Sequence, residues 1–313
     1  MSVLSTSNYP TSQIGILGAG AIGQLIGFQI NSQLQNQQKM SYITQATGLI
    51  SDPSPHLTSL VSQTHHYNAH VLSLHSPEIS EIKLLIVAVK AYQVFNAISH
   101  LITKLPADCH ILLLHNGLGP HLEILPLLQP HQGLSLGTTS QGAQRIDKWH
   151  VKHTGKGLTQ IGHYTGIAMA DEYRQLLSHS IPDCDFVDEI IPALWQKLAV
   201  NCVINPLTAI HQCKNGILQQ SEFSEKIQQI LFELNLVAQK EAITLDMQQL
   251  TQRVLKVIQL TSNNYSSMFQ DIQHKKLTEI DYINGYLLKV AQKHGIQLDV
   301  NQQLVESVQL LAQ

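Results

Sequence analysis

The stretch IGILGAGAIG, residues 14–23, constrains the fold of this chain more than any other. A short apolar run leads into three glycines in the pattern GxGxxG, and a helical pattern continues to residue 34. The first glycine of such a turn allows the tight bend, the second lets a pyrophosphate approach the backbone, and the third lets the helix pack closely on the sheet. The N-terminus of the helix then attracts the phosphates.

This turn predicts a dinucleotide site, and a plain strand–turn–helix without a ligand is the alternative. The residues of the predicted site are Gly18, Ala19, Gly20, Ala21, Ile22 and Gly23.

The pattern around this turn divides the chain into two parts. Short β-like runs alternate with helical segments in the first part, which is typical of a parallel α/β sheet. These runs cover 39–44, 70–75, 83–90, 110–117, 133–139 and a stretch around 150–163. Helical periodicity dominates from about residue 190, over 192–210, 222–244, 248–260, 262–274 and 277–294. We therefore predict an α/β protein with an N-terminal Rossmann-type parallel sheet domain, 1–189, and an all-helical domain, 190–313. Residues 1–12 carry no signal-peptide features and are expected to form a flexible lead-in.

Composition excludes several classes of function. The chain has 313 residues and a net charge of −3, so no basic footprint for nucleic acid is present. Its longest compact apolar run, 84–89, is too short to cross a bilayer, and no basic amphipathic helix suggests a membrane surface. The four cysteines form no CxxC, which favours reduced thiols in the cytoplasm. The 17 histidines show no metal spacing, so no metal is expected.

The end of the second strand usually decides which dinucleotide is bound. An acid there binds the ribose 2′-hydroxyl of NAD and repels the 2′-phosphate of NADP. Residues 41–45 read SYITQ, without an acid and also without an arginine, so the sequence leans towards NADP. Thr44, Gln45 and Lys39 are candidates for contacting the phosphate, and equally ordinary surface residues.

Two further strands end in polar residues. Lys90 follows the run LLIVAV, and Asn116 follows ILLLH. Ligands of open parallel sheets bind beyond the carboxyl ends of the strands, so both side chains are candidates for the site. The alternatives are a lysine that extends its ammonium to water and a common Asn-Gly turn.

Residues 194–210 form an apolar helical segment that carries one polar stripe. Lys197, Asn201 and Asn205 are spaced by four, which places them along one face. An unpaired buried ammonium is costly, and buried amides need partners, so the stripe points to a ligand; helix capping or hydrogen bonds between helices would be the structural alternative. Pro206 removes a backbone donor and predicts a kink at Cys202.

A second polar face follows from Asn264, Ser267 and Asp271, which are spaced as i, i+3 and i+7. Ser267 is a candidate donor to a substrate carboxylate. Asp271 is interpreted mainly as structural, in a pair with Lys275 or holding its helix. Glu279 is expected to open the next helix, where an acid can simply match the helix dipole.

With these motifs together, the chain resembles the ketopantoate reductase (2-dehydropantoate 2-reductase) family, of the 6-phosphogluconate-dehydrogenase-like group. The resemblance runs from residue 14 to about 296. It rests on the stretches GAGAIGQL, VKAYQV, LLHNGLG, GTTSQGAQR, WQKLAVNCVINPLTAI, KNGIL and NNYSSMFQDIQHKKLTEIDYINGYLL. The blocks 195–216 and 263–288 are the most specific.

The resemblance implies reduction of 2-dehydropantoate to (R)-pantoate by NADPH, a step of pantothenate and coenzyme A biosynthesis, in a cleft between the two domains. It implies Lys197 as the general acid and Glu279 as a catalytic or cofactor residue. The positions it implies near the cofactor are Lys90, Asn116, Ala143 and Glu279. Those it implies for substrate are Asn116, Lys197, Asn201, Asn205, Asn215 and Ser267. The sequence leaves a monomer and a homodimer open.

Two departures from the family pattern stand out. Many relatives carry a basic residue after the second strand, and none is present here. The segment DVNQQL stands where relatives often have a proline and an Asn-Thr pair, and is interpreted as a structural difference outside the chemistry. Two other functions remain open: a related NAD(P)-dependent reductase of another branched 2-oxo acid, and a non-catalytic dinucleotide sensor.

Overall fold

The computed structural model describes residues 13–34, 39–44 and 53–312. The predicted lead-in, 1–12, and the candidate Gln45 lie outside these ranges. Contacts divide the chain into two compact units. Unit 1 comprises Met1–Val89, Gln93–His115 and Glu123–Ile190; unit 2 comprises Lys90–Tyr92, Asn116–Leu122 and Ile191–Gln313. Two short segments that follow strands of unit 1 thus belong to unit 2 by their contacts.

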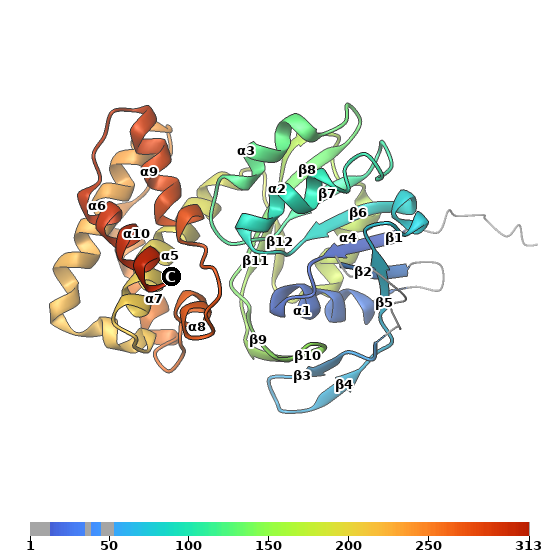
Figure 1. The fold of residues 1–313 in the computed structure, drawn as a ribbon, viewed down its shortest axis with the longest axis horizontal. Coiled ribbons are helices and arrows are strands. Elements are labelled where there is room, and N and C mark those ends of the chain that lie inside the picture. Colours follow the sequence, from blue (N-terminus) through green and yellow to red (C-terminus); the bar gives the residue numbers. More distant parts are fainter. Residues whose placement is uncertain (1–12, 35–38, 45–52, 313) are drawn as a thin grey trace, which may run out of the picture. The chain divides into compact units, whose positions relative to one another are not determined.

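Unit 1 is built on one large sheet, as Figure 1 shows. This sheet has eight strands. Its strand order is β12-β11-β8-β7-β6-β1-β2-β5, parallel from β8 to β5, with β11 antiparallel to β8. The strands are β1 (Gln13–Leu17), β2 (Lys39–Thr44), β5 (His70–Ser73), β6 (Ile82–Val87), β7 (His110–Leu113), β8 (Gly133–Thr139), β11 (Thr159–Gly166) and β12 (Cys184–Phe186). The predicted parallel sheet is confirmed. The direction of chain progression reverses at β1, between β2 and β6, which is where ligands of such sheets bind.

A smaller sheet covers helix α1 (Ala21–Asn31). Its strands, in the order β4-β3-β10-β9, are β4 (Thr64–His66), β3 (His56–Thr58), β10 (His150–Gly155) and β9 (Gly142–Asp147). Helix α1 contacts β1 and β2 on one side and β9 and β10 on the other, as Figure 1 shows. Leu25 of α1 packs with Leu57 and Val151 of the small sheet. The helix that starts at the glycine turn is therefore enclosed by two sheets.

Several elements of unit 1 were absent from the sequence prediction. Among them are β3, β4, β9, β12 and the helix α4 (Asp171–Ser180). The strands β3, β4 and β12 have three residues each, and β4 and most of β9 are exposed, so these strands carry little hydrophobic alternation for a sequence pattern to detect. The remaining helical elements of this half are η1 (Pro77–Glu81), α2 (Ala91–Ser99), α3 (Pro120–Ile124) and η2 (Leu125–Leu127).

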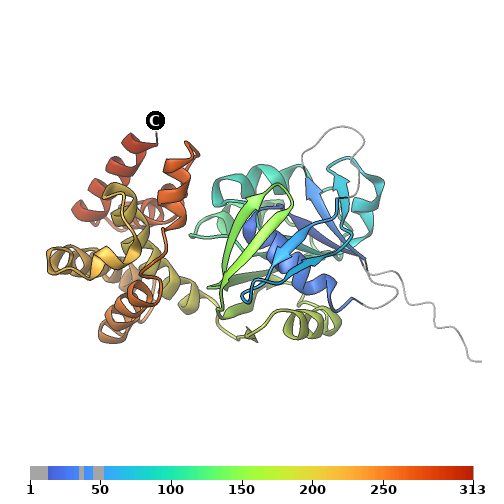
Figure 2. The ribbon, with the colours of Figure 1, turned by 90° about the horizontal axis from the view of Figure 1, so that it is seen from below.

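In unit 2 every regular element among the described residues is helical, as the yellow-to-red ribbon of Figure 2 shows. The α-helices are α5 (Ile191–Ile210), α6 (Ser224–Lys240), α7 (Met247–Leu260), α8 (Ser267–Gln273), α9 (Asn284–Lys293) and α10 (Asp299–Leu311). Short 3₁₀ turns lie between them: η3 (Asn215–Gln219), η4 (Ser221–Phe223) and η5 (Ile280–Tyr282). None of the helices in the described part of the chain has the length and hydropathy needed to cross a membrane.

The predicted starts of two helices were wrong, because both helices begin later in the sequence. Helix α8 begins at Ser267, because the Ser266 hydroxyl accepts a hydrogen bond from Phe269 N and caps it, so Asn264 lies outside the helical face proposed for it. The helix predicted from 277 begins at Asn284, after η5, so Glu279 does not open it. Helix α10 was not predicted.

Candidate active site

The three glycines of the turn between β1 and α1 have different surroundings. Gly18 has φ +110°, and a Cβ there would lie 2.9 Å from the backbone of Ala88 and Val89. A Cβ at Gly23 would lie 1.9 Å from the Gly18 carbonyl oxygen. A Cβ at Gly20, in contrast, would meet no described atom within 4 Å. The fold therefore requires glycine at 18 and 23, whereas at 20 the missing side chain leaves open space.

The start of α1 suits an anion. Gly20 is its N-cap, and in the described part of the chain no side chain forms a cap hydrogen bond there. The first turn of α1 carries no acidic residue. The partial positive charge of the helix N-terminus is thus left for a negatively charged ligand, as in other strand–glycine–helix turns.

A buried polar atom lies at the end of β2. The Thr44 hydroxyl is buried and has no hydrogen-bond partner among the described residues. Lys39, at the other end of β2, is exposed. Ala143 lies on β9 and packs against the cluster of Leu25, Leu57 and Val151.

A charged cluster lies within unit 2, formed by Lys90, Asn116, Asp271 and Glu279. Lys90 Nζ lies 2.7 Å from Asp271 Oδ2 and 3.2 Å from Glu279 Oε2. Glu279 also accepts hydrogen bonds from Ala91 N at 3.0 Å and from Asn116 Nδ2 at 3.4 Å. Asp271 pairs with Lys90, not with Lys275 as the sequence pattern had suggested. Lys90 is therefore bound to carboxylates rather than extended to water.

The segment after β7 is fixed by its backbone. Leu118 N donates to Tyr282 O at 2.8 Å, and a Cβ on Gly117 would lie 2.3 Å from that same oxygen. Gly117 has φ +77°, which glycine adopts without strain. This close approach to η5 explains why Asn116 lies beside Glu279, which immediately precedes η5.

The charges in this cluster affect one another. Burial by itself lowers the pKa of Lys90, but the charges of Glu279 and Asp271 and the hydrogen bonds to them outweigh it and raise that pKa. Burial raises the pKa of Asp271, and the Lys90 charge opposes this shift. Lys90 therefore stays an ammonium and partly neutralises two carboxylates.

Lys197 lies on α5 in a different electrostatic setting. The residue is partly buried. Burial lowers its pKa to about 8, and the nearby charge of Glu279 opposes that shift. Glu279 thus acts electrostatically on both lysines, and Lys197 is the one close to its protonation midpoint at neutral to mildly alkaline pH.

The predicted stripe on α5 is confirmed as one helical face, because Lys197, Asn201 and Asn205 all lie within a continuous helix. Asn205 is buried and Asn201 is partly buried. The helix assignment runs across Pro206. Unbranched polar side chains at this spacing on a mostly buried helix form a row along which a small polar ligand could bind.

Two other predicted substrate residues lie at helix starts. Asn215 begins η3 and donates from Nδ2 to Thr261 Oγ1 at 2.9 Å, while its buried Oδ1 has no partner among the described residues. Ser267 is the first residue of α8 and is exposed. A buried acceptor without a donor is costly, so Asn215 is suited to a ligand that donates to it.

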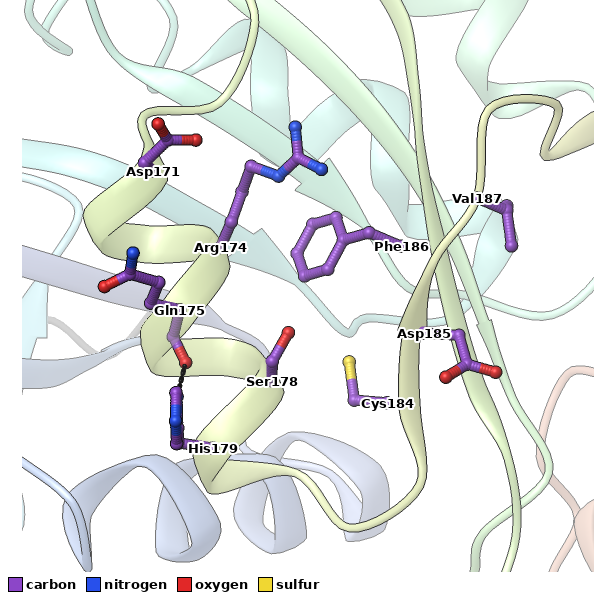
Figure 3. Close-up of a pocket in the computed structure, with 9 residues that line it drawn as sticks. All are labelled: Asp171, Arg174, Gln175, Ser178, His179, Cys184, Asp185, Phe186 and Val187. Atoms are coloured by element: carbon purple, nitrogen blue, oxygen red, sulfur yellow. Dashed lines mark hydrogen bonds between the residues drawn. The ribbon is translucent and has the colours of Figure 1, made fainter.

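A surface groove of about 640 Å³ lies elsewhere, between α4 and the edge strand β12 of unit 1. Figure 3 shows Arg174 reaching across it towards the Phe186 ring, 4.9 Å from guanidinium carbon to ring centroid. It contains none of the predicted site residues. In the part of the chain that the structure describes, no group of three His, Cys, Asp or Glu side chains is arranged to hold a metal.

Comparison with known proteins agrees with these observations. Residues 14–166 match the family described as Ketopantoate reductase PanE/ApbA, and residues 189–312 match its C-terminal family. The 2-dehydropantoate 2-reductase of Vibrio cholerae is 36% identical over 301 residues, covering 96% of this chain and 98% of the relative. That of Escherichia coli O157:H7 is 37% identical over 305 residues, covering 95% and 94%.

Solved structures extend the likeness to the fold. A probable 2-dehydropantoate 2-reductase from Bacillus subtilis superimposes with a TM-score of 0.77 at 26% identity, over 96% of this chain and 99% of that one. A D-mandelate dehydrogenase in complex with NADH superimposes with a TM-score of 0.81 at 25% identity, over 96% and 98%. Both halves of the sequence match in order and almost in full, and the chain belongs to the ketopantoate reductase family.

Proposed function

We propose that this chain is a 2-dehydropantoate 2-reductase, which reduces 2-dehydropantoate to (R)-pantoate with NADPH in pantothenate and coenzyme A biosynthesis. The observation that carries the proposal is the placement of Lys197. Its ammonium lies on a polar stripe of an otherwise buried helix, under the influence of Glu279, with its pKa lowered to about 8. Membership of the family gives the reaction its substrate class.

Reduction of a ketone needs a group that stabilises charge on the carbonyl oxygen. A bound dinucleotide would supply the hydride to the carbonyl carbon. Lys197 donates a hydrogen bond to the oxygen as negative charge develops and then gives it the proton, so the product is an alcohol and the lysine is left neutral until water reprotonates it. A pKa close to the working pH suits both steps.

Glu279 is proposed to keep Lys197 protonated. Its charge raises the pKa of Lys197 against the effect of burial. Ala91 N and Lys90 both hold the Glu279 carboxylate in place, at 3.0 and 3.2 Å. The remaining proposed substrate contacts are Asn116, Asn201, Asn205, Asn215 and Ser267, whose amides and hydroxyl match a hydroxylated 2-oxo acid.

The residues present fit a dinucleotide. The proposed cofactor contacts are Gly18, Ala19, Gly20, Ala21, Ile22, Gly23, Lys90, Asn116, Ala143 and Glu279. The open space at Gly20 and the uncapped start of α1 would accept a pyrophosphate. NADPH is favoured over NADH because residues 41–44 carry no acid, and the buried Thr44 hydroxyl is left for a phosphate. The cytoplasm, where thiols stay reduced, is the proposed compartment, and the chain would act as a monomer or homodimer.

A second candidate is a reductase of another branched 2-oxo acid. It is favoured by the fold likeness to a D-mandelate dehydrogenase that was solved with NADH. The absence of a basic residue in 41–45 bears on how strongly NADPH is preferred over NADH, and not on the choice of 2-oxo acid.

One assay separates these functions. NADPH oxidation is followed at about 340 nm with 2-dehydropantoate, beside 2-oxoisovalerate and beside NADH. We expect NADPH-dependent turnover on 2-dehydropantoate. Turnover on 2-oxoisovalerate alone would support the second candidate, and tight NADPH binding without any turnover would instead indicate a dinucleotide sensor.

A further inference from the structure

Helix α5 contains a proline at a position where its hydrogen bonding would be broken. Pro206 has no N–H, so the carbonyl of Cys202, four residues earlier, loses its helical donor. Cys202 is fully buried, and water is not available to replace that donor. The structure supplies a substitute: Asn284 Nδ2, from the start of α9, donates to Cys202 O at 3.0 Å.

The orientation of Asn284 is fixed by a series of hydrogen-bonded side chains. Its Nδ2 also donates to Asn301 Oδ1 at 2.9 Å, and Asn301 Nδ2 donates to Glu233 Oε2 at 2.7 Å. Glu233 in turn accepts from the backbone N–H groups of Val300 and Asn301 at the start of α10. Asn284 and Asn301 are both 0% exposed. Four helices, α5, α6, α9 and α10, are thereby joined through side-chain amides and one carboxylate.

The hydrogen-bonded series of Asn284, Asn301 and Glu233 contacts α5 in the middle of the polar stripe of that helix. Cys202 directly follows Asn201, and Pro206 directly follows Asn205. Any change in the direction of the helix at this point would move Asn205 relative to Lys197. The part of α5 that follows Pro206 is also fixed. Thr208 Oγ1 donates to Ile204 O at 2.6 Å and lies 2.7 Å from Ser266 Oγ, the cap of α8.

We propose that Asn284 is a positioning residue: its amide replaces the hydrogen bond that Pro206 removes from α5 and so aligns Asn205 with Asn201 and Lys197. Asn301 and Glu233 orient that amide. The kinetic part of this inference rests on the proposed function, whereas the hydrogen-bond part does not. It also gives a role to Asn301, in the segment DVNQQL.

The first test uses unfolding and needs no substrate. Asn284→Ala, Pro206→Ala and the double variant form a cycle with the wild type. Alanine at 206 restores an N–H for Cys202 O, so Asn284→Ala should lower Tm clearly less in the Pro206→Ala background than in the wild type. The loss of the Asn301 contact is common to both backgrounds and cancels. Equal losses of Tm would overturn the inference.

The second test asks whether alignment matters for turnover. We expect Asn284→Ala to lower kcat/KM for 2-dehydropantoate by about tenfold, the effect of one lost buried hydrogen bond, and to leave KM for NADPH within about twofold. In the Pro206→Ala background the same substitution should cost less than about threefold. Equal effects in both backgrounds would mean that Asn284 does not act through the carbonyl of Cys202.

A matched control separates positioning from general loss of stability. Val237 is fully buried on α6, so Val237→Ala removes buried atoms without removing a polar contact. Assayed well below its Tm, it should keep its kcat/KM. A control that loses activity in proportion to Tm would overturn the positioning role. Absence of turnover in the wild type would overturn the proposed function, and the unfolding cycle would still decide the relation between Asn284 and Pro206.

Discussion

The glycine turn of unit 1 and the charged cluster of unit 2 are built on opposite principles. The turn lies within six consecutive residues and depends on side chains that are missing, at Gly18, Gly20 and Gly23. The cluster joins Lys90 to Asp271 and Glu279, 181 and 189 residues away, and depends on charged side chains that are present. Adding atoms should therefore damage the first region, and removing charge should damage the second.

The largest effect is expected from removal of the Lys197 ammonium. Lys197→Met should lower kcat by about a thousandfold, the usual contribution of a general acid that also stabilises an oxyanion, while NADPH still binds. Steady-state kinetics would measure kcat, and fluorescence titration would measure the affinity for NADPH. Lys256 is an exposed lysine of α7, so Lys256→Met is the matched control and should leave kcat and NADPH affinity unchanged. Near-normal turnover of Lys197→Met would refute its assignment as the acid.

The glycine turn gives the next effect, and a pair of variants tests it. Gly23→Ala forces a Cβ to within 1.9 Å of the Gly18 carbonyl, so it should cost about 2–3 kcal/mol in unfolding free energy by denaturant titration. Gly20→Ala has space for the new methyl group and should leave stability within about 0.5 kcal/mol. If the pyrophosphate passes there, Gly20→Ala should nevertheless weaken NADPH binding about tenfold. Unchanged affinity would remove Gly20 from the cofactor site.

Each asparagine of the α5 stripe should contribute less than the lysine. Asn201→Ala and Asn205→Ala should each cost about 1–3 kcal/mol in kcat/KM for 2-dehydropantoate, because a substrate group loses a buried partner. Kinetics at saturating NADPH would measure this. Asn96→Ala, an exposed asparagine of α2, should leave the parameters unchanged. Losses confined to thermal stability would make the stripe structural.

The smallest expected effect is a shift in pH dependence. The general acid must be protonated, so kcat/KM for reduction should fall as pH rises through the pKa of Lys197, about 8. The Glu279 charge raises that pKa, so in Glu279→Gln the fall should begin at lower pH. Asp271→Asn removes a carboxylate that pairs with Lys90 and not with Lys197, so the fall of kcat/KM should stay at the same pH. If kcat/KM of Glu279→Gln falls at the same pH as that of the wild type, Glu279 does not raise the pKa of Lys197.

The same lysine predicts the direction of a stability change. Its folded pKa lies below that of an unfolded lysine, so the cost of burying the ammonium is fully present below about pH 8. Between that pH and the unfolded pKa the folded state releases its proton first, and this contribution to stability rises with pH. Lys197→Met should remove that rise, as measured by denaturant unfolding at several pH values.

Sequence patterns predicted what depends on neighbouring residues. The strand–glycine–helix turn, the parallel sheet and the stripe on α5 all follow from hydrogen bonding and side-chain periodicity within one element. The same reasoning failed at Asp271, for which it offered Lys275, four residues on. Helix α8 ends at Gln273 and Lys275 has φ +54°, so the two are not neighbours on a helix.

The amino-acid sequence by itself therefore determined the family, the two kinds of architecture and the row of Lys197, Asn201 and Asn205. Tertiary structure alone decided that Glu279 and Asp271 pair with Lys90, that the charge of Glu279 acts on Lys197, and that Asn284 donates to the carbonyl left without a donor by Pro206. Those contacts join residues from separate elements, and their energy depends on burial and on distances of about 3 Å that no local pattern encodes.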